Sequence, residues 1–394
     1  MPLLVLLASP SFARAELSLP RSIEVRVPGA YVRTSPSVQG SRRGTLSFGA
    51  RLQPLEAREA EGCAAPWYRI GAEAWVCGEH VERSGAEPSA RQLPFLEEGE
   101  IVPHRYAFAG PDGARFYRSV EDIEYEDWER EFDPRTGLHL RELVDHQGRQ
   151  YYRTVEGGGF VPAEDVVPAR PSGFAGTTID TDEPVGWVWR RPVQVRPAAG
   201  RGRILRRLGH RTGVVALEQS TVGRMLWLRI GVEEWIRDQG LRLVHRTAPP
   251  PSVGADERWV HVDRSRQVLT AYEGRRAVYA TLVSTGRQGV ATPDGTFRIW
   301  AKLATAEMSD ETDSVDESPY LMQGVPWVMY FNEGVALHGA YWHDEFGIAR
   351  SHGCVNLAPR DAAFIFEWAR PLLPPGWTGV LPTQSDPGTL VVVE

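Results

Sequence analysis

Several features are scarce in this 394-residue chain, and each scarcity excludes a class of protein. No apolar run approaches the roughly eighteen residues that a membrane-spanning helix needs, so the sequence predicts no transmembrane segment. The formal net charge of −7 and the lack of a basic patch argue against a nucleic-acid partner. Lysine occurs once, as Lys302, and arginine carries nearly all of the positive charge. We interpret this bias as a codon preference and not as chemistry.

The first residues have the pattern of an export signal. Residues 1–15 (MPLLVLLASPSFARA) contain a short apolar core followed by Ala13-Arg14-Ala15, a small-x-small sequence. This order is typical of the end of a secretory signal peptide and its cleavage site. We therefore expect an exported protein of the periplasm or cell envelope.

Cysteine is also scarce, with three in the chain. Cys63 and Cys77 flank a predicted β-hairpin, and an exported protein reaches an oxidising compartment in which disulfides persist. The sequence favours a Cys63–Cys77 disulfide, which leaves Cys354 as the free thiol.

The region before the C-terminal third repeats itself. Residues 67–76 (WYRIGAEAWV) reappear as residues 227–236 (WLRIGVEEWI), and residues 151–161 form a weaker copy. Apolar and polar residues alternate around a glycine-containing turn in each copy, which predicts a β-hairpin. A strand with a Val-Arg pattern precedes each of the two stronger copies, at residues 31–36 and 193–197.

These repeats predict two or three small β modules. A Val-Arg strand followed by a Trp-x-Arg-Ile-Gly hairpin resembles the bacterial Src-homology-3-type barrels that accompany many cell-wall enzymes. The predicted modules span residues 22–85 and 185–245, and a diverged third copy spans residues 97–170. A proline-rich linker at residues 246–256 follows, and such segments act as semi-rigid spacers. The modules are candidates for binding glycan or a wall protein.

The C-terminal third holds the most informative motif, which is His338-Gly339 followed by Ser351-His352-Gly353-Cys354-Val355-Asn356. A cysteine is a useful nucleophile as the thiolate, and a nearby imidazole lowers its pKa. A glycine before the cysteine permits a turn that aims successive backbone N–H groups at one point. The motif predicts cysteine-based acyl transfer.

Two other interpretations apply to the same residues. A lone cysteine is often a small buried apolar residue. Alternatively, His338, His343, His352 and Cys354 could bind zinc through imidazole and thiolate ligands. Their spacing contains no close C-x-x-C or H-x-x-x-H pair, and a single cysteine is unusual in a structural zinc site. We therefore expect no metal ion.

The motif strongly resembles that of the L,D-transpeptidase family, which is a His-Gly, a gap of a dozen or more residues, and Ser/Thr-His-Gly-Cys-x-Asn or -Arg. Twelve residues, 339–350, separate His338 from Ser351 here. Four upstream segments also resemble the family: residues 259–274 (WVHVDRSRQVLTAYEG), 284–286 (STG), 292–297 (TPDGTF) and 325–331 (VPWVMYF). The resemblance covers residues 257–383. It implies a mostly antiparallel β catalytic domain with one helix after the cysteine, so the whole chain is expected to be mainly β.

The resemblance also implies catalytic roles. Cys354 would be the nucleophile, and His338 would be the base that takes its proton. The carbonyl group of Gly339 would orient the His338 ring, as a third group does in other triads. His352 would lie beside the thiolate. The backbone N–H groups of Gly353 and Cys354 would form the oxyanion hole.

Other residues are expected to contact the substrate. The family's active-site flap corresponds to the acidic stretch 306–318, so Tyr320 and Trp327 become candidates for lining the site. Arg350 is a candidate for holding a substrate carboxylate. Asn356 is expected to start the helix that follows. The expected substrate-binding set is Ser351, Asn356, Arg350, Trp342, Tyr320 and Trp327.

These features predict an exported L,D-transpeptidase that acts on peptidoglycan stem peptides without a cofactor. By resemblance, Cys354 forms a thioester with release of D-alanine, and an amine of a second stem resolves it to a 3-3 cross-link. Two alternatives remain. One is an L,D-carboxypeptidase or a hydrolase of wall-linked peptides on the same fold, in which water resolves the thioester. The other is a non-catalytic wall-binding protein.

Overall fold

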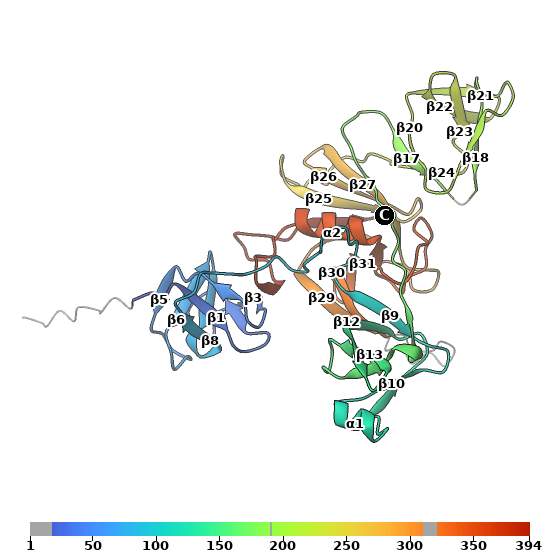
Figure 1. The fold of residues 1–394 in the computed structure, drawn as a ribbon. Helices are drawn as coiled ribbons and strands as arrows, with labels where there is room; N and C mark the ends of the chain where they lie inside the picture. Colours follow the sequence, from blue (N-terminus) through green and yellow to red (C-terminus); the bar gives the residue numbers. More distant parts are fainter. Residues whose placement is uncertain (1–17, 190, 310–320) are drawn as a thin grey trace, which may run out of the picture. The chain divides into compact units, whose positions relative to one another are not determined.

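The computed structural model describes residues 18–189, 191–309 and 321–394. They are mainly β-strands, which confirms the predicted fold class (Figure 1). Contacts divide the chain into two compact units, the second of which begins at Gln92. Across the described ranges, no helix is both long and apolar enough to cross a bilayer. The predicted signal peptide, residues 1–15, lies outside the described residues.

The first unit contains one β module. Its elements are β1 (Ser22–Val25), β2 (Tyr31–Arg33), β3 (Arg42–Leu46), β4 (Arg51–Leu52), β5 (Glu56–Arg58), β6 (Trp67–Gly71), β7 (Ala74–Cys77), η1 (Gly78–His80) and β8 (Val81–Ser84). Strand β1 pairs with β4 and β8, β2 pairs with β3, and β6 pairs with β5 and β7. The predicted disulfide is present between Cys63 and Cys77. Both cysteines pack against Trp67 and Trp75.

The middle module opens the second unit. Its elements are β9 (Arg105–Ala109), β10 (Ala114–Phe116), α1 (Val120–Glu124), β11 (Arg130–Phe132), β12 (Gly137–His146), β13 (Arg149–Thr154), β14 (Phe160–Pro162), η2 (Ala163–Asp165) and β15 (Val166–Pro168). Strand β9 pairs with β12 and β15, β10 with β11, and β13 with β12 and β14. Residues 121–131, which are rich in Asp and Glu, are split between α1, a loop and β11.

The third module follows a connecting segment that includes β16 (Thr177–Thr178). Its strands are β17 (Val185–Val188), β18 (Val193–Val195), β19 (Arg206–Leu208), β20 (Gly213–Val215), β21 (Glu218–Val222), β22 (Met225–Gly231), β23 (Glu234–Arg237) and β24 (Leu241–Leu243). Strand β17 pairs with β20 and β24, β18 with β19, and β22 with β21 and β23.

The three modules share one order of strand pairing. In each, the first strand pairs with the fourth and the last, and the second pairs with the third; in the middle module, the long β12 takes the place of both the fourth and the fifth strand. The second strand region also meets the hairpin at equivalent places, namely Arg33↔Trp75, Tyr117↔Phe160 and Arg196↔Trp235. The middle region thus pairs its strands as the two stronger repeats do. The Src-homology-3-like assignment and the module boundaries stay predictions.

The C-terminal region contains two sheets that share one long strand, β27 (Arg276–Ser284). The strand order of one sheet is β28 (Gly295–Arg298), β34 (Leu390–Val393), β25 (Arg258–Asp263), β26 (Val268–Glu273) and β27. The order of the other is β27, β32 (Val355–Leu357), β31 (Val335–Gly339), β30 (Leu321–Asn332), β29 (Ala301–Ser309) and β33 (Trp377–Val380). Most pairs are antiparallel, as predicted. The parallel pairs within these sheets are β25–β34 and β31–β32. Strand β34 lies beyond residue 383, where the predicted domain ended.

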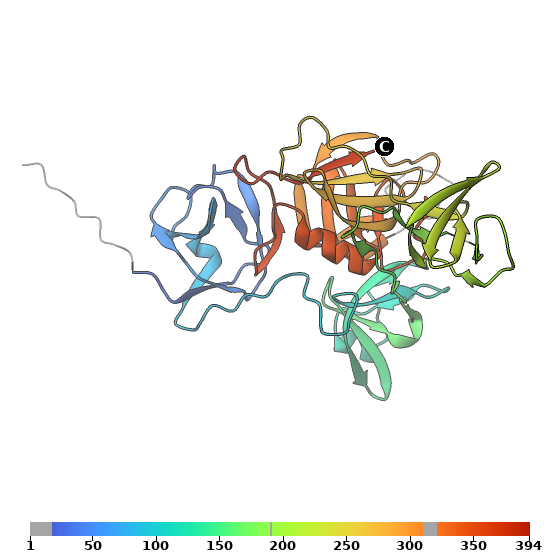
Figure 2. The same ribbon diagram turned by 90° about the horizontal axis from the view of Figure 1, so that it is seen from above.

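One helix follows the cysteine motif, as the sequence predicted. Helix α2 (Pro359–Trp368) begins with a proline in its first turn, where a missing N–H has no cost. It packs on β30 and β31 with Ala362, Ile365 and Phe366 buried (Figure 2). Asn356 does not start this helix, because it lies in β32 and Ala358 is the N-cap residue.

The chain's one lysine stabilises the end of α2. Lys302 is fully buried, and its Nζ donates to the carbonyl oxygens of Phe366 at 2.5 Å and Ala369 at 2.7 Å. These carbonyls lie at the end of the helix and lack intrahelical partners, so the amine supplies the donors that they need. Burial lowers the pKa of Lys302 to about 7. Lys302 therefore has a structural role that the sequence did not indicate.

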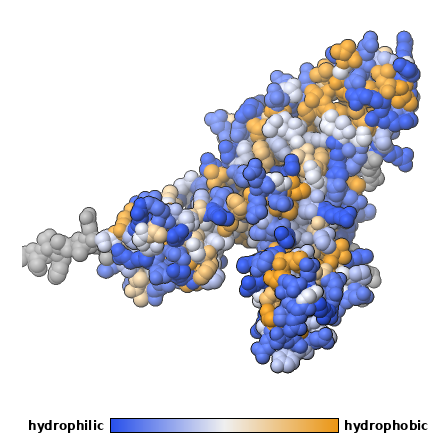
Figure 3. Space-filling view, in the orientation of Figure 1, coloured by the Kyte–Doolittle hydropathy of each residue, from blue (hydrophilic) through white to orange (hydrophobic). Residues whose placement is uncertain are grey.

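The third module exposes apolar side chains, which appear as orange patches over β21 to β23 (Figure 3). The exposed large apolar residues of this module are Ile204, Leu205, Val215, Leu217, Val222, Met225 and Val232. Its buried core is formed instead by residues such as Val195, Leu228 and Ile236.

Candidate active site

The parallel pairing of β31 with β32 brings the two halves of the motif together. The register places Leu337 opposite Val355 and His338 opposite Asn356, so Cys354 enters β32 beside the strand that carries His338. Both residues line one cavity of about 480 Å³. The residues that line it are Arg135, Arg287, Met308, Met322, His338, Trp342, Arg350, Ser351, His352, Cys354 and Asn356.

The thiol of Cys354 is half-buried and is not part of a disulfide. Its Sγ accepts a hydrogen bond from the Ala336 N–H at 3.4 Å and lies 3.8 Å from the Gly334 carbonyl oxygen. Burial raises the pKa of this thiol above its ordinary value, and the Ala336 hydrogen bond opposes that shift only in part. Cys354 is therefore a thiol at neutral pH.

The imidazole of His338 is buried and oriented. Its Nδ1 lies 3.3 Å from the carbonyl oxygen of Gly339. A carbonyl oxygen can only accept, so Nδ1 carries the proton and Nε2 is left as an acceptor. Burial lowers the pKa of His338 to about 4. The ring is therefore neutral at pH 7 and can take a proton. Trp342 stacks on it with ring centroids 5.6 Å apart.

The cysteine loop depends on the glycine before Cys354. Gly353 has a φ of 126°, a backbone conformation that side-chain-bearing residues rarely adopt. The Ser351 hydroxyl donates to the Cys354 carbonyl oxygen and accepts from the Gly353 N–H at 3.2 Å. Ser351 therefore holds the loop in shape. The Gly353 N–H, one of the two predicted oxyanion donors, therefore already has a partner in this structure.

Two of the upstream segments that resemble the family, residues 284–286 and 292–297, form hydrogen bonds to the cysteine loop. Thr292 donates from its hydroxyl to the Gly353 carbonyl oxygen at 2.7 Å and accepts from the Gly286 N–H at 2.9 Å. The Arg350 N–H donates to the Thr285 carbonyl oxygen at 2.9 Å. Ser-Thr-Gly and Thr-Pro-Asp-Gly thus act by hydrogen bonding the motif and not by touching the sulfur.

Arg287 is a site residue that sequence reasoning missed. Its backbone N–H donates to the Ser351 carbonyl oxygen at 2.9 Å, and its guanidinium contacts Nε2 of His352. A guanidinium only donates, so that nitrogen of His352 is an acceptor in this pair. The position directly after Ser-Thr-Gly was the one available signal. His352 therefore lines the cavity and also accepts a hydrogen bond from Arg287.

The expected substrate-binding residues have different locations. Trp342 lines the cavity and Arg350 lines it while pairing with Glu345. Asn356 lines it too, and its Nδ2 lies 2.9 Å from Nε2 of His343. Trp327 does not line this cavity, because its ring is buried in the core against the backbone of Gly339.

Two further predictions concern residues near this site. Tyr320 lies outside the described residues, so its predicted contact with the substrate stays a prediction. The alternative zinc interpretation concerned His338, His343, His352 and Cys354. The described part of the chain contains one group of potential metal ligands, Cys63, Cys77 and Glu79, and its two sulfurs are joined in the disulfide.

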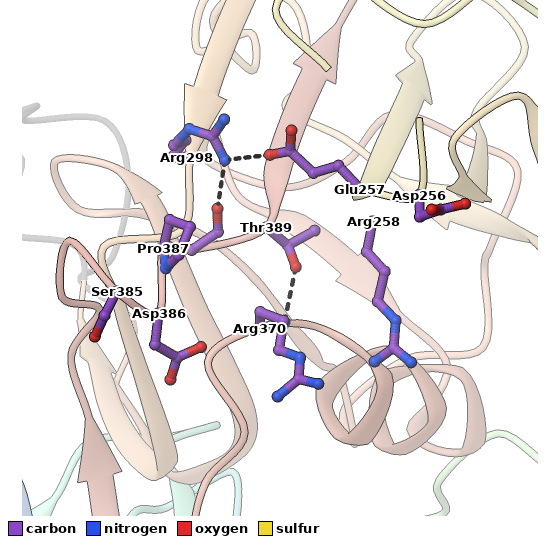
Figure 4. Close-up of a pocket in the computed structure, with 10 residues that line it drawn as sticks. Asp256, Glu257, Arg258, Arg298, Arg370, Ser385, Asp386, Pro387 and Thr389 are labelled. Carbon is purple, nitrogen blue, oxygen red and sulfur yellow. Dashed lines mark hydrogen bonds and ion pairs between the residues drawn. The ribbon is translucent and has the colours of Figure 1, made fainter. Parts of the chain in front are cut away.

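A second cavity of about 660 Å³ lies elsewhere in the C-terminal region (Figure 4). Arg298 points across it and contacts the Glu257 carboxylate at 2.6 Å and the Gly388 carbonyl oxygen at 2.9 Å. The Arg370 N–H donates to the Thr389 hydroxyl at 2.7 Å. These contacts fasten the segment before β34 to β28 and to the chain after α2, and the residues that line the cavity include neither a thiol nor an imidazole.

Comparisons with known proteins agree with the motif. Residues 257–393 match the model of the L,D-transpeptidase catalytic domain (YkuD). L,D-transpeptidase 1 of Mycobacterium tuberculosis is 27% identical over 180 residues, which covers 41% of this chain and 69% of that protein.

Solved structures similar to this chain include two L,D-transpeptidases. The catalytic domain from Enterococcus faecium is 25% identical and covers 35% of this chain and 98% of its own, with a TM-score of 0.28. The enzyme from Mycobacterium smegmatis is 20% identical and covers 46% of this chain and 90% of its own, with a TM-score of 0.30. By the family match, residues 257–393 of this chain belong to the L,D-transpeptidase catalytic domain family.

Proposed function

We propose that this protein is an exported L,D-transpeptidase that acts on peptidoglycan stem peptides through a Cys354 thioester. The single observation that carries the proposal is that a half-buried thiol and a neutral, oriented imidazole line one cavity within the matched domain. This is the pair of groups that cysteine acyl transfer requires.

The protonation states support a general-base mechanism. Cys354 is a thiol and His338 is a neutral base in the resting state. The proton therefore moves from sulfur to Nε2 of His338 as the sulfur attacks the peptide carbonyl. The Gly339 carbonyl accepts from Nδ1 throughout, which stabilises the imidazolium that forms. The negative oxygen of the tetrahedral intermediate is bound by the Cys354 N–H.

The intermediate collapses when the C–N bond to the terminal D-alanine breaks. His338 returns the proton to the leaving amine, and the acyl group remains on the sulfur as a thioester. The amine of a second stem peptide then attacks the thioester, loses its proton to His338 and releases the thiol. The product is a cross-link between the third residues of two stems.

The test uses the full chain and a disaccharide-tetrapeptide, with products analysed by mass spectrometry. We expect loss of D-alanine and formation of a cross-linked dimer. A Cys354→Ala variant should form neither, and a Cys63→Ala/Cys77→Ala variant should form both. A monomer shortened by one residue without any dimer would instead identify a carboxypeptidase. Wild-type protein that forms no product would contradict the proposal.

A further inference from the structure

The catalytic cavity contains one side chain from outside the matched domain. Arg135 belongs to the middle module, and it lines the cavity together with Cys354 and His338. The family match begins at residue 257, more than one hundred positions later in the chain. A module that repeats elsewhere in the chain therefore contributes to the active site.

The backbone around Arg135 is held firmly on its own module. Arg135 lies in the turn between β11 and β12, with a φ of 69°. Its N–H donates to the Ala109 carbonyl oxygen at 3.0 Å, and the Ala109 N–H donates to the Thr136 carbonyl oxygen at 2.9 Å. The Thr136 N–H closes the turn on the Asp133 carbonyl oxygen at 3.1 Å. The turn is thus tied to β9 by two hydrogen bonds.

The same turn is fastened to the catalytic domain. Gly137, two residues after Arg135, pairs with Met322 at the start of β30. A Cβ atom at Gly137 would lie 2.5 Å from the Met322 sulfur and 2.5 Å from the Tyr341 hydroxyl, so a side chain here would push both groups away from the turn.

A second contact holds the two parts together beside it. Tyr106 of β9 stacks on Tyr341 with centroids 3.9 Å apart, and its hydroxyl donates to the Gly324 carbonyl oxygen at 2.8 Å. The two rings belong to one apolar cluster, and Cys354 packs against that cluster. The location of Arg135 is therefore set by packing that includes the nucleophile's surroundings.

The three arginines of the cavity differ in their partners. Arg350 pairs with the Glu345 carboxylate, and Arg287 contacts His352. Arg135 is exposed, and within the described ranges no carboxylate pairs with it. Among the described residues that line the cavity, none is acidic. A guanidinium binds a carboxylate in a bidentate manner, so an anionic group of the substrate is its natural partner.

We propose that Arg135 is a specificity residue that binds a carboxylate of the donor peptide while Cys354 attacks it. The inference rests on the proposed function for its substrate, and it assigns to the middle module a part in substrate selection. Such a contact serves to position the donor and to discriminate against peptides in which that carboxylate is amidated.

The experiment compares the wild type with Arg135→Gln and Arg135→Glu. Arg141→Gln is the matched control, because Arg141 is an exposed arginine on β12 that does not line the catalytic cavity. The substrates are one tetrapeptide with free carboxylates, the same peptide with a C-terminal carboxamide, and the same peptide with a side-chain carboxamide. Thermal unfolding of every variant shows whether the fold is retained.

We expect Arg135→Gln to lower kcat/KM for the free peptide about tenfold, mainly through KM, because a charge-assisted hydrogen bond of this kind contributes about 1.4 kcal/mol. Arg135→Glu should lower it further, and Arg141→Gln should leave it unchanged. The wild type should lose the same factor when the carboxylate that Arg135 binds is amidated. Arg135→Gln should not lose it again with that peptide, which identifies the carboxylate.

Binding separates this inference from the proposed function. The Kd of the free peptide is measured with Cys354→Ala and with Cys354→Ala/Arg135→Gln, neither of which turns over. A weaker Kd in the double variant supports the contact even if the wild type makes no cross-link. Equal Kd values, or equal kcat/KM for wild type and Arg135→Gln with every peptide, would overturn it.

Discussion

The first module and the catalytic domain stabilise small β structures by different chemistry. In the first module, a disulfide joins Cys63 to Cys77 and packs against the buried Trp67. In the catalytic domain, the cysteine stays reduced, and buried polar groups such as Lys302 and Asp361 hold the helix behind it. Cysteine is thus oxidised in one region and is a free thiol that lines the candidate site in the other. Each region can be altered without the other, and this makes the comparison testable.

The largest expected effect separates the two uses of cysteine. Cys354→Ala should lower the rate of D-alanine release about a thousandfold or more, because no other group in the cavity can form the thioester. Its thermal unfolding should remain close to that of the wild type. Cross-linking assays alongside calorimetry measure both quantities. An active Cys354→Ala variant would end the distinction between structural and chemical cysteines.

The pH dependence of catalysis tests whether the Cys354 thiol and the His338 imidazole are both neutral before the reaction. Burial lowers the pKa of His338 to about 4, so the base form persists at all pH values above that. We expect kcat/KM to fall about tenfold per pH unit only below pH 4, as His338 gains a proton and can no longer accept one. Initial rates from pH 3 to 8 measure this. An acid limb near pH 6.5 would indicate a solvated ring instead.

The disulfide should affect one region alone. Cysteines 14 positions apart close a loop for which the chain-entropy model gives about 3 kcal/mol of stabilisation. Cys63→Ala/Cys77→Ala should therefore unfold the first module at lower denaturant concentration and leave the later transition in place. Urea titration monitored by tryptophan fluorescence measures this. A loss of cross-linking in the same variant would show that the regions depend on each other.

The buried lysine should affect the other region. Lys302→Met leaves the carbonyls of Phe366 and Ala369 without a donor, at a cost of about 2 kcal/mol. The unfolding transition of the catalytic domain should shift to lower denaturant concentration, and that of the first module should not change. Arg276→Met is the control, since Arg276 is an exposed cation on β27 of the same domain. A Lys302→Met variant as stable as this control would contradict the capping role.

The most gradual effect is the pH dependence of stability, which is spread over about two pH units. Burial raises the pKa of Asp361 to about 6, while its carboxylate oxygens accept from Gly176, Tyr279 and Thr281. Between about pH 4 and 6, the folded chain keeps a proton that the unfolded chain releases. Stability from this group is therefore present at low pH and lost as the pH rises through 6.

Asp361→Asn isolates that contribution. The difference in unfolding free energy between this variant and the wild type should change by about 1 kcal/mol per pH unit from pH 4 to 6. Above pH 7 it should be constant. A difference that is flat throughout would mean that Asp361 is ionised in the folded protein at pH 4.

The repeats show how far sequence patterns extended. Residues 67–76 and 227–236 form hairpins with the same register, in which Trp67 faces Cys77 and Trp227 faces Arg237. The predicted hairpins and the disulfide are confirmed. That Arg237 and Trp227 instead line a cavity of about 490 Å³ in the third module was not predicted. The paired residues of each hairpin are close in sequence, so their pairing could be predicted. The cavity beside Trp227 is also lined by residues from other parts of the third module, and sequence patterns did not predict their positions.

The candidate site also contains residues that the sequence predicted and residues that it did not. Cys354, His338, Gly353 and the helix after the motif could be predicted, because their chemistry and spacing are local. Sequence reasoning missed Arg287 and Arg135 and expected Trp327 to line the cavity, whereas its ring lies in the core. Sequence reasoning also assigned no role to Lys302, which donates to the carbonyl oxygens at the end of α2.

The amino-acid sequence by itself determined the reactive motif, the hairpin repeats and the disulfide partners, since each depends on residue types at fixed short spacing. Tertiary structure decided the protonation states of Cys354 and His338, because burial sets the cost of charge and depends on everything packed around the group. It also decided that Arg135 and Cys354 line the same cavity. These two residues are about two hundred positions apart, and the segments that carry them are held together by the Gly137–Met322 pairing and the stacking of Tyr106 on Tyr341.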